Sequence, residues 1–551
     1  MSIDLNSSNV ATRENRIGSI TGYFGSLQDL SEQSEGGTRR GCSRCFSQSS
    51  SCLSMCAPGQ LANIRDVAII HHGPSGCSAV SAMVYWQDKV MAKKRGVTTN
   101  TVYVGTDVNE RDTIFGSAEQ LRKIILETYE RHHPKAIFVA SSCTTGITGE
   151  DIDAVVEEVR PEIDVPIAAV HCEGFKSRIW ATGFDISDHA VLSEIVEPPK
   201  QKRNTINFKN FYESARPEIV EMFHEFDLDP VFLYCNSSVE ELRHLSEAQA
   251  TTCICGTLGN YLGNGLEEKY GVPYIRTVNP LGITGFETWL REIGRVTNRS
   301  DKIEAYIARE RKKYIPQIEE IKKELKGLRA VIGMGPGYTF EVSRVLDELG
   351  IQVVWALAWH YDKKYENGDV PPSMKYLLDK GIDYGASVSD QQNYEVMNIL
   401  HRYQPDLYLS RHPGSTVWAI KNGTPAAYAA DEYMIFGYKH TLEFANAVLD
   451  AIHNRSFEEN LAAHVKLPYT DWWYQQNIDY FMQQGKEKKK NGYDTGRTAV
   501  QVLAGRHAEC AGYSRGHPGA PLGPRLRRKA LGYHRELGTL LPEHFPLHEP
   551  Q

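Results

Sequence analysis

Cysteines are the residues of this sequence whose type and spacing carry the most chemistry. The chain has eleven of them, an odd number, and its first residues, MSIDLNSSNVATRENR, lack the apolar run of a secretory signal. A disulfide framework is therefore a poor interpretation, and thiolates kept for metal or redox chemistry are a better one. The cysteines are Cys42, Cys45, Cys52 and Cys56 in a Gly/Ser-rich stretch, then Cys77, Cys143, Cys172, Cys235, Cys253 and Cys255, and finally Cys510.

The spacing of these cysteines leaves three kinds of site open. Zinc sites usually combine two close pairs, but after the C-x-x-C of Cys42 and Cys45 the only later tight pair is the C-x-C of Cys253 and Cys255. Iron–sulfur clusters accept thiolates from distant loops. From residue types alone, an iron–sulfur cluster, a zinc site and inert buried thiols all remain possible.

The elements that must position these thiols are repeated strand-loop-helix units. Runs such as VAIIHH at 67–72 and AIFVAS at 136–141 are continuously apolar, which is typical of parallel strands covered on both faces. We therefore expect an α/β fold of several doubly wound, Rossmann-like domains. Ligands of such sheets bind where the strands end, and Cys77 and Cys143 both follow strand ends, so their sulfurs are expected to be neighbours.

Length and charge exclude several classes of protein. The 551 residues suffice for about three to five domains, and 61 basic against 69 acidic residues give a net charge of −8, which disfavours a nucleic-acid partner. No apolar run of about 18 residues suggests a membrane span, so we expect a cytoplasmic protein. The expected division is 1–39 as an N-terminal extension, 40–215, 216–326 and 327–485 as Rossmann-like domains, and 486–551 as a flexible tail.

Several segments together resemble a known family. They are, in order, SSCLSMC, HHGPSGCSAV, GTDVNERDTIFG, SSCTTGITGEDIDAV, HCEGF and TTCICGTLGNYLGNGLEEKYGVPYI. The ordered set is similar to the component 1 proteins of nitrogenase and their relatives, especially the alpha-type subunits, over roughly residues 40–480. This resemblance implies three Rossmann-like domains with metal clusters among them.

The resemblance also implies a role for three of the thiols. Cys52, Cys77 and Cys143 match the positions that hold an [8Fe-7S] P-cluster between an alpha-type and a beta-type subunit, in an α2β2 assembly. Cys56 is an extra thiol near the first position, and Cys42 and Cys45 also compete with Cys52 for it.

A second cluster is implied at Cys255, which stands where the family attaches its active-site cofactor, with Cys253 as a rival. The implied group is a carbide-containing [8Fe-9S] type iron–sulfur cofactor, with or without molybdenum. Its second ligand has no clean counterpart here, and His440, His412 and His360 are the open candidates.

The sequence departs from true nitrogenase at Phe184, where the family has a histidine tied to proton delivery. Among the relatives it most resembles the alpha-type subunits of the methylthio-alkane reductases, which cleave a carbon–sulfur bond of small thioethers to methanethiol and an alkane. That resemblance implies an ATP-dependent reductase protein with a [4Fe-4S] cluster as electron donor. A scaffold for cofactor assembly and a nitrogenase alpha subunit proper remain the alternatives.

Overall fold

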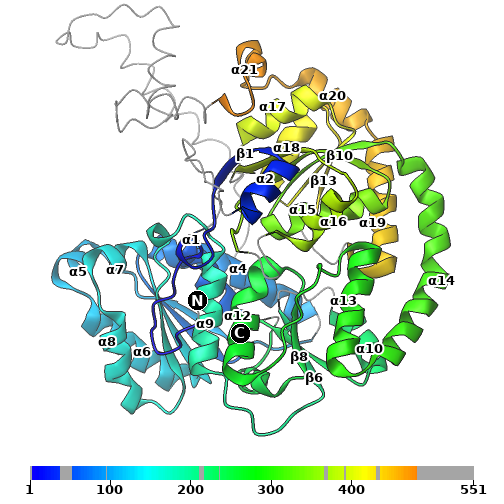
Figure 1. Ribbon diagram of the computed structural model, residues 1–551. Helices are drawn as coiled ribbons and strands as arrows, with labels where there is room; N and C mark the ends of the chain where they lie inside the picture. Colours follow the sequence, from blue (N-terminus) through cyan, green and yellow to red (C-terminus); the bar gives the residue numbers. More distant parts are fainter. Residues whose placement is uncertain are drawn as a thin grey trace, which may run out of the picture. The chain divides into compact units, whose positions relative to one another are not determined.

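Three β-sheets, built mainly of parallel strands, form the framework of the described part of the chain (Figure 1). Each sheet carries its own helices, as expected of an α/β fold. The computed structural model describes residues 3–36, 52–94, 96–209, 216–234, 236–364, 370–389, 393–411, 413–429 and 435–480.

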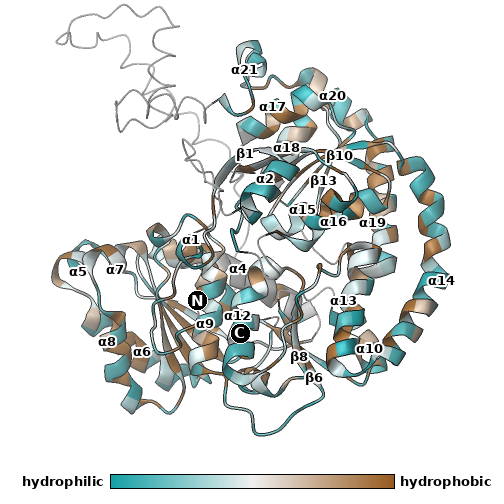
Figure 2. Ribbon diagram, viewed as in Figure 1, coloured by the Kyte–Doolittle hydropathy of each residue, from teal (hydrophilic) through white to brown (hydrophobic). Residues whose placement is uncertain are grey.

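The first sheet has the strand order β3-β2-β4-β5, all parallel. Alternate residues of β2 enter two apolar cores: Val67 and Ile69 pack with α3 and α9, whereas Ala68 and Ile70 pack with α6 and α8. Because both faces are covered, these strands are mostly hydrophobic, as Figure 2 shows. The elements are β2 (Val67–His72), β3 (Val102–Gly105), β4 (Ala136–Ser141) and β5 (Ile167–Val170), with α3 (Leu53–Leu61), α4 (Ser75–Lys94), α5 (Glu110–Phe115), α6 (Ala118–His132), α7 (Cys143–Thr148), α8 (Ile152–Val159), α9 (Thr182–Glu194) and the 3-10 turns η1 (Arg160–Glu162) and η2 (Gly174–Lys176).

The second sheet has the order β7-β6-β8, also parallel. Gly263 lets α12 pack closely, because a Cβ atom there would lie 2.5 Å from the ring of Tyr274. The long, charged helix α14 leads from this sheet toward the third and is largely hydrophilic in Figure 2. The elements are β6 (Thr205–Lys209), β7 (Asp229–Leu233), β8 (Ala250–Cys253), α10 (Arg216–Glu225), α11 (Val239–Arg243), η3 (Leu245–Glu247), α12 (Gly256–Tyr270), α13 (Gly282–Thr297) and α14 (Ser300–Leu325).

The third sheet has six strands in the order β1-β11-β10-β9-β12-β13. Its strands are parallel except β1, which comes from the N-terminal segment and pairs antiparallel with β11. The elements are α1 (Arg13–Arg16), β1 (Gly22–Ser26), α2 (Leu27–Glu35), β9 (Arg329–Met334), α15 (Pro336–Glu348), β10 (Gln352–Ala358), α16 (Pro372–Asp379), β11 (Gly385–Ser389), α17 (Asn393–Tyr403), β12 (Leu407–Ser410), α18 (Pro413–Lys421), β13 (Ala426–Tyr428), α19 (Gly437–His453), α20 (Ser456–His464) and α21 (Asp471–Gln475).

Two strands fall outside the expected domain edges. β6 precedes residue 215 yet joins the second sheet, and β1 belongs to the third sheet although it lies in the expected extension 1–39. All described elements lie in one compact unit, residues 1–493, and the division into three domains stays a prediction. The expected tail, 486–551, lies outside the described residues. Within the described part, no helix is both long enough and apolar enough to cross a bilayer.

Candidate functional site

Cys52, Cys77 and Cys143 all lie where a helix begins. Cys52 is the N-cap residue of α3, Cys77 lies in the first turn of α4, and Cys143 is the first residue of α7. β2 and β4, which lead into α4 and α7, are neighbouring parallel strands. The chain therefore delivers Cys77 and Cys143 to the same edge of one sheet.

Gly174 marks the point at which these thiols converge. A Cβ atom on Gly174 would lie 3.3 Å from Sγ of Cys143 and 3.2 Å from Cβ of Cys52. Partial burial raises the pKa of Cys77, and the nearby thiols of Cys143 and Cys52 raise it further. The structure thus brings the three predicted thiols together, with Cys52 exposed and the other two partly exposed.

The neighbouring cysteines have different surroundings. Cys56 is buried one turn beyond Cys52, and a Cβ atom on Gly183 would lie 2.9 Å from its sulfur. Cys172 is fully buried, and its thiol donates to the carbonyl of Ser141 at 3.1 Å. Burial is the main reason that the pKa values of Cys56 and Cys172 are raised. Cys42 and Cys45 lie outside the described residues.

Large apolar side chains are exposed around the three thiols. Ile147, on the same helix as Cys143, is 76% exposed, and Phe175, next to Gly174, is 56% exposed. Ile114 and Phe115 at the end of α5 are also exposed. A group of exposed apolar side chains of this size is typical of a surface that a partner covers.

A single-ion site is not formed where the structure can be described. Among those residues, no three His, Cys, Asp or Glu side chains come close enough to hold one metal ion.

Cys255 is separate from these thiols. It is 2% exposed and is the N-cap residue of α12, two residues after the end of β8. Its rival Cys253 contacts the hydroxyl of Tyr274 at 3.1 Å and packs against Gly259. Burial opposes the charge of Arg13, but Asp185, Asp362 and Cys255 keep the Arg13 pKa above its ordinary value.

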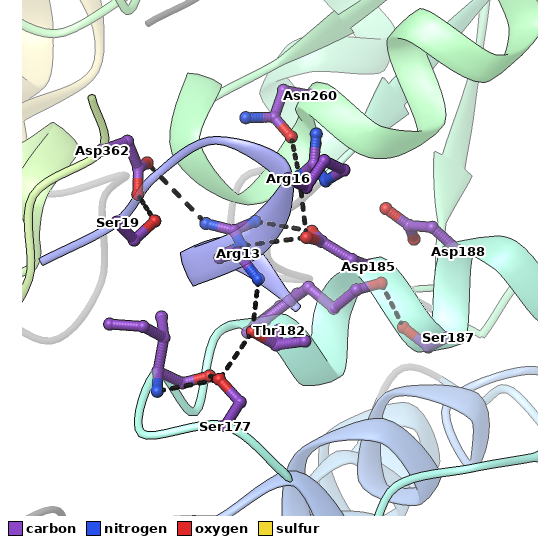
Figure 3. Close-up of polar contacts among 12 residues, drawn as sticks. Arg13, Arg16, Ser19, Ser177, Thr182, Asp185, Ser187, Asp188, Asn260 and Asp362 are labelled. Atoms are coloured by element: carbon purple, nitrogen blue, oxygen red, sulfur yellow. Dashed lines mark hydrogen bonds and ion pairs between the residues drawn. The ribbon is translucent and has the colours of Figure 1, made fainter. Parts of the chain in front are cut away.

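Arg13 is the centre of a buried polar cluster that joins all three sheets (Figure 3). Its guanidinium is fully buried and pairs with Asp185 of α9 at 2.7 Å and with Asp362, after β10, at 4.0 Å. Arg16 adds bonds to Asp185 at 2.7 Å and to Asn260 of α12 at 3.1 Å. The short N-terminal helix α1 thus contacts elements associated with each of the three sheets.

Some buried polar atoms of this cluster have no hydrogen-bond partner among the described residues. They include Nη1 of Arg13 and Nε2 of His360, and Nε2 of His360 lies 3.8 Å from Asp362. Burial lowers the pKa of His360 to about 4 against the pull of Asp362, so the imidazole is neutral and can offer a lone pair. Buried polar atoms without partners indicate that another group completes the site. The residues near Cys255 therefore leave buried polar atoms that a further bound group could contact.

The other candidate histidines differ from His360. Both ring nitrogens of His440 are paired, Nε2 with Glu218 at 2.8 Å and Nδ1 with Glu443 at 2.9 Å. His440 lines a polar cavity of about 260 Å³ among α10, α13, α14 and α19. His412 lies outside the described residues.

Sequence reasoning missed the charged residues of the buried interior. Arg13 lies in the expected extension, and its bonds to Asp185 span 172 positions, so no local pattern could reveal them. Lys209, which pairs with Asp188, had a usable signal, since it is a charged residue at the end of the largely buried strand TINFK. Phe184 is buried beside Trp180, with ring centroids 5.6 Å apart.

Residues 52–453 match the family described as nitrogenase component 1 type oxidoreductase, and the chain belongs to that family. It is 27% identical to the nitrogenase molybdenum-iron protein alpha chain of Methanothermobacter marburgensis, over 71% of this chain and 84% of that one. It is 26% identical to the nitrogenase iron-molybdenum cofactor biosynthesis protein NifE of Methanococcus maripaludis, over 73% and 83%. The solved structure of nitrogenase Cp1 at pH 6.5 is similar in fold, with a TM-score of 0.62, 20% identity and coverage of 78% and 93%.

Proposed function

We propose that this chain is the catalytic alpha-type subunit of a nitrogenase-like iron–sulfur reductase. The observation that carries the proposal is the presence of two distinct sulfur sites. The thiols of Cys52, Cys77 and Cys143 converge at a partly exposed edge, and Cys255 is buried beside Arg13. The three thiols would hold half of an interfacial [8Fe-7S] cluster, which a beta-type subunit would complete. Cys255 would hold a resident [8Fe-9S] type cofactor.

The ligands of the cofactor follow from the same geometry. Cys255 would hold one end of it, and His360 is the best second ligand because its Nε2 is buried, neutral and without a hydrogen-bond partner. His440 is a poor one, since carboxylates engage both of its nitrogens. When bound, the cofactor would supply low-potential electrons to a substrate, received through the interfacial cluster from an ATP-dependent reductase protein.

The proposed substrate is a small thioether, as in the methylthio-alkane reductases. Reductive cleavage takes two electrons and two protons, breaks one carbon–sulfur bond, and forms a carbon–hydrogen bond in the alkane and a sulfur–hydrogen bond in methanethiol. The apolar pair of Phe184 and Trp180 supports an uncharged substrate. The competing proposal, a scaffold for cofactor assembly, is favoured by the nearly equal identity to an alpha chain and to NifE.

Anaerobic purification with a co-expressed beta-type subunit tests the proposal. We expect iron in excess of zinc, and ATP-dependent release of alkane from thioethers into the headspace when the reductase protein is added. Cys255→Ala should abolish alkane release while the iron of the interfacial cluster is retained. Abundant zinc without iron would refute the iron–sulfur assignment, and bound iron with every thioether inert would favour the scaffold.

A further inference from the structure

A buried lysine, carboxylate and phenol meet beside the candidate cofactor site. Lys209 and Asp188 are both fully buried and form an ion pair. Tyr234 donates to the same carboxylate oxygen of Asp188 at 2.6 Å, and the ammonium of Lys209 lies 3.8 Å from the centroid of the Tyr234 ring. Lysine is almost never completely buried in proteins unless it is paired, and Asp188 supplies that pair here.

The topology places Lys209 at the sheet edge from which Cys255 emerges. Lys209 is the last residue of β6 and stands opposite Cys253, the last residue of the neighbouring parallel strand β8. Its carbonyl accepts from the amide of Ile254 at 3.3 Å, directly before Cys255. The side chain also approaches Gly259 of α12, the helix that Cys255 caps.

The pair is chemically incomplete as a purely structural ion pair. Oδ2 of Asp188 is buried and has no hydrogen-bond partner, although burying a charge is costly unless its bonding capacity is filled. Apolar rings cover the ammonium, with the centroid of Phe184 at 6.0 Å. Such a site is dry, and its one open acceptor atom can take up a proton.

The titratable groups that face Lys209 come from several elements. They are Asp188 and Asp185 on α9, Tyr234 after β7, Cys56 on α3, and Cys253 of β8, which approaches Gly259 together with Lys209. Burial lowers the pKa of Lys209 and raises that of Asp188. Both shifts bring the two groups closer to sharing a proton than they would be in water.

We propose that Lys209, held by Asp188 and Tyr234, is the proton relay of the cofactor site. This inference rests on the proposed function, because thioether cleavage consumes two protons. Each passes from the Lys209 ammonium toward the reacting group and leaves a neutral amine, which regains a proton through the carboxyl group of Asp188, the protons coming ultimately from water. The two electrons come from the iron–sulfur donor, and the protons end in the new carbon–hydrogen and sulfur–hydrogen bonds.

Two variants of Lys209 in the complete complex separate a relay from a structural pair. Lys209→Arg keeps the positive charge and the ion pair but cannot release its proton. Lys209→Met/Asp188→Leu removes both charges together and so leaves neither unpaired. For each variant we expect wild-type iron content and a wild-type electron paramagnetic resonance signal of the cofactor, with product formation reduced at least about 100-fold.

The matched control is Arg344→Met/Glu341→Gln/Glu348→Gln, which removes together another buried set of paired charges, in α15. It should leave the rate of product formation per bound cofactor unchanged.

Tyr234→Phe should retain the iron of the wild-type complex and shift the pH profile of product formation.

Hydrogen and alkane are both measured, since both products consume protons. If the wild type releases hydrogen but no alkane, the thioether substrate is wrong while the hydrogen rates still test the relay. Wild-type rates and pH profile in Lys209→Arg, or in the double variant, would overturn the relay and leave the enzyme proposal intact. If the wild-type complex forms neither product, the enzyme proposal falls and the relay with it.

Discussion

Gly174 is the residue on which the three-thiol arrangement depends most closely. A side chain there would press against Cys52 and Cys143 at 3.2–3.3 Å, closer than most Cβ contacts. We expect Gly174→Ala to weaken iron retention by the complex roughly tenfold, as changes beside metal ligands do. Iron per complex after a chelator challenge measures this.

Gly414→Ala is the control for Gly174→Ala, because no atom lies within 4 Å of a Cβ placed there. Equal iron retention in both variants would show that the cysteines near Gly174 hold no cluster.

His71 and His72 make the stability of the fold depend on pH. Burial lowers the pKa of each from its ordinary 6.5 to about 4, so the unfolded chain takes up protons first as the solution is acidified. Their stabilisation is fully present above pH 6.5 and is lost as the pH falls toward about 4. We expect roughly 2 kcal/mol lost for each by about pH 5, measured as a fall in the urea midpoint.

The two histidines bond to neutral groups, His71 to Ser54 and Tyr103, and His72 to Thr106 and Ser117. The hydrogen bonds given for the two imidazoles in the described residues are therefore not bonds to carboxylates, which would have stabilised the protonated rings. A urea midpoint that stays constant or rises between about pH 6.5 and 5 would contradict this explanation.

Individual residues were predictable only where a local pattern marked them. Cys77 and Cys143 each follow an apolar strand, and that pattern alone is enough to predict that they share one sheet edge. Arg13 and Asp185 could not be predicted to meet, because a buried ion pair between distant segments leaves no periodic signal in either.

At the scale of elements, α7 and the turn η2 form the exposed rim of the three-thiol site. Ile147 on α7 is 76% exposed, and a partner subunit that covers it would bury it. We expect Ile147→Asp to weaken association with the beta-type subunit at least about tenfold, because a charge would be desolvated there. Sedimentation of the mixed subunits measures the affinity.

Phe457→Asp is the comparison for Ile147→Asp, since Phe457 is 65% exposed on α20, away from the first sheet. Both variants should have the same urea unfolding midpoint as the wild type. Unchanged affinity in Ile147→Asp would show that the partner binds elsewhere.

Most strands were predictable because each is a continuous apolar run between turn residues. The runs expected at 67–72 and 136–141 both form strands, β2 and β4. β1 was missed, because GYFGS is short, glycine-bearing and stabilised by antiparallel pairing with β11 far along the chain.

At the scale of the whole molecule, the N-terminal segment contacts elements associated with all three sheets. It lies before the residues that match the family, yet Arg13 pairs with Asp185 of α9 and with Asp362 after β10, and Arg16 bonds to Asn260 of α12. We expect Arg13→Ala to cost roughly 3–5 kcal/mol of unfolding free energy, because it leaves buried carboxylates poorly paired.

Urea unfolding measures that loss, with Arg295→Ala as the control. Arg295 forms an exposed pair with Glu292, so its removal should cost about 0–1 kcal/mol. A similarly small effect of Arg13→Ala would mean that the segment is not needed to hold the units together.

The most direct measurement on the whole assembly is the iron content of the anaerobically purified complex, with and without Cys77→Ser/Cys143→Ser. The account predicts that the double variant loses the iron of the interfacial cluster while keeping the iron bound at Cys255. Iron content identical to the wild type, or zinc in place of iron in both, would contradict it.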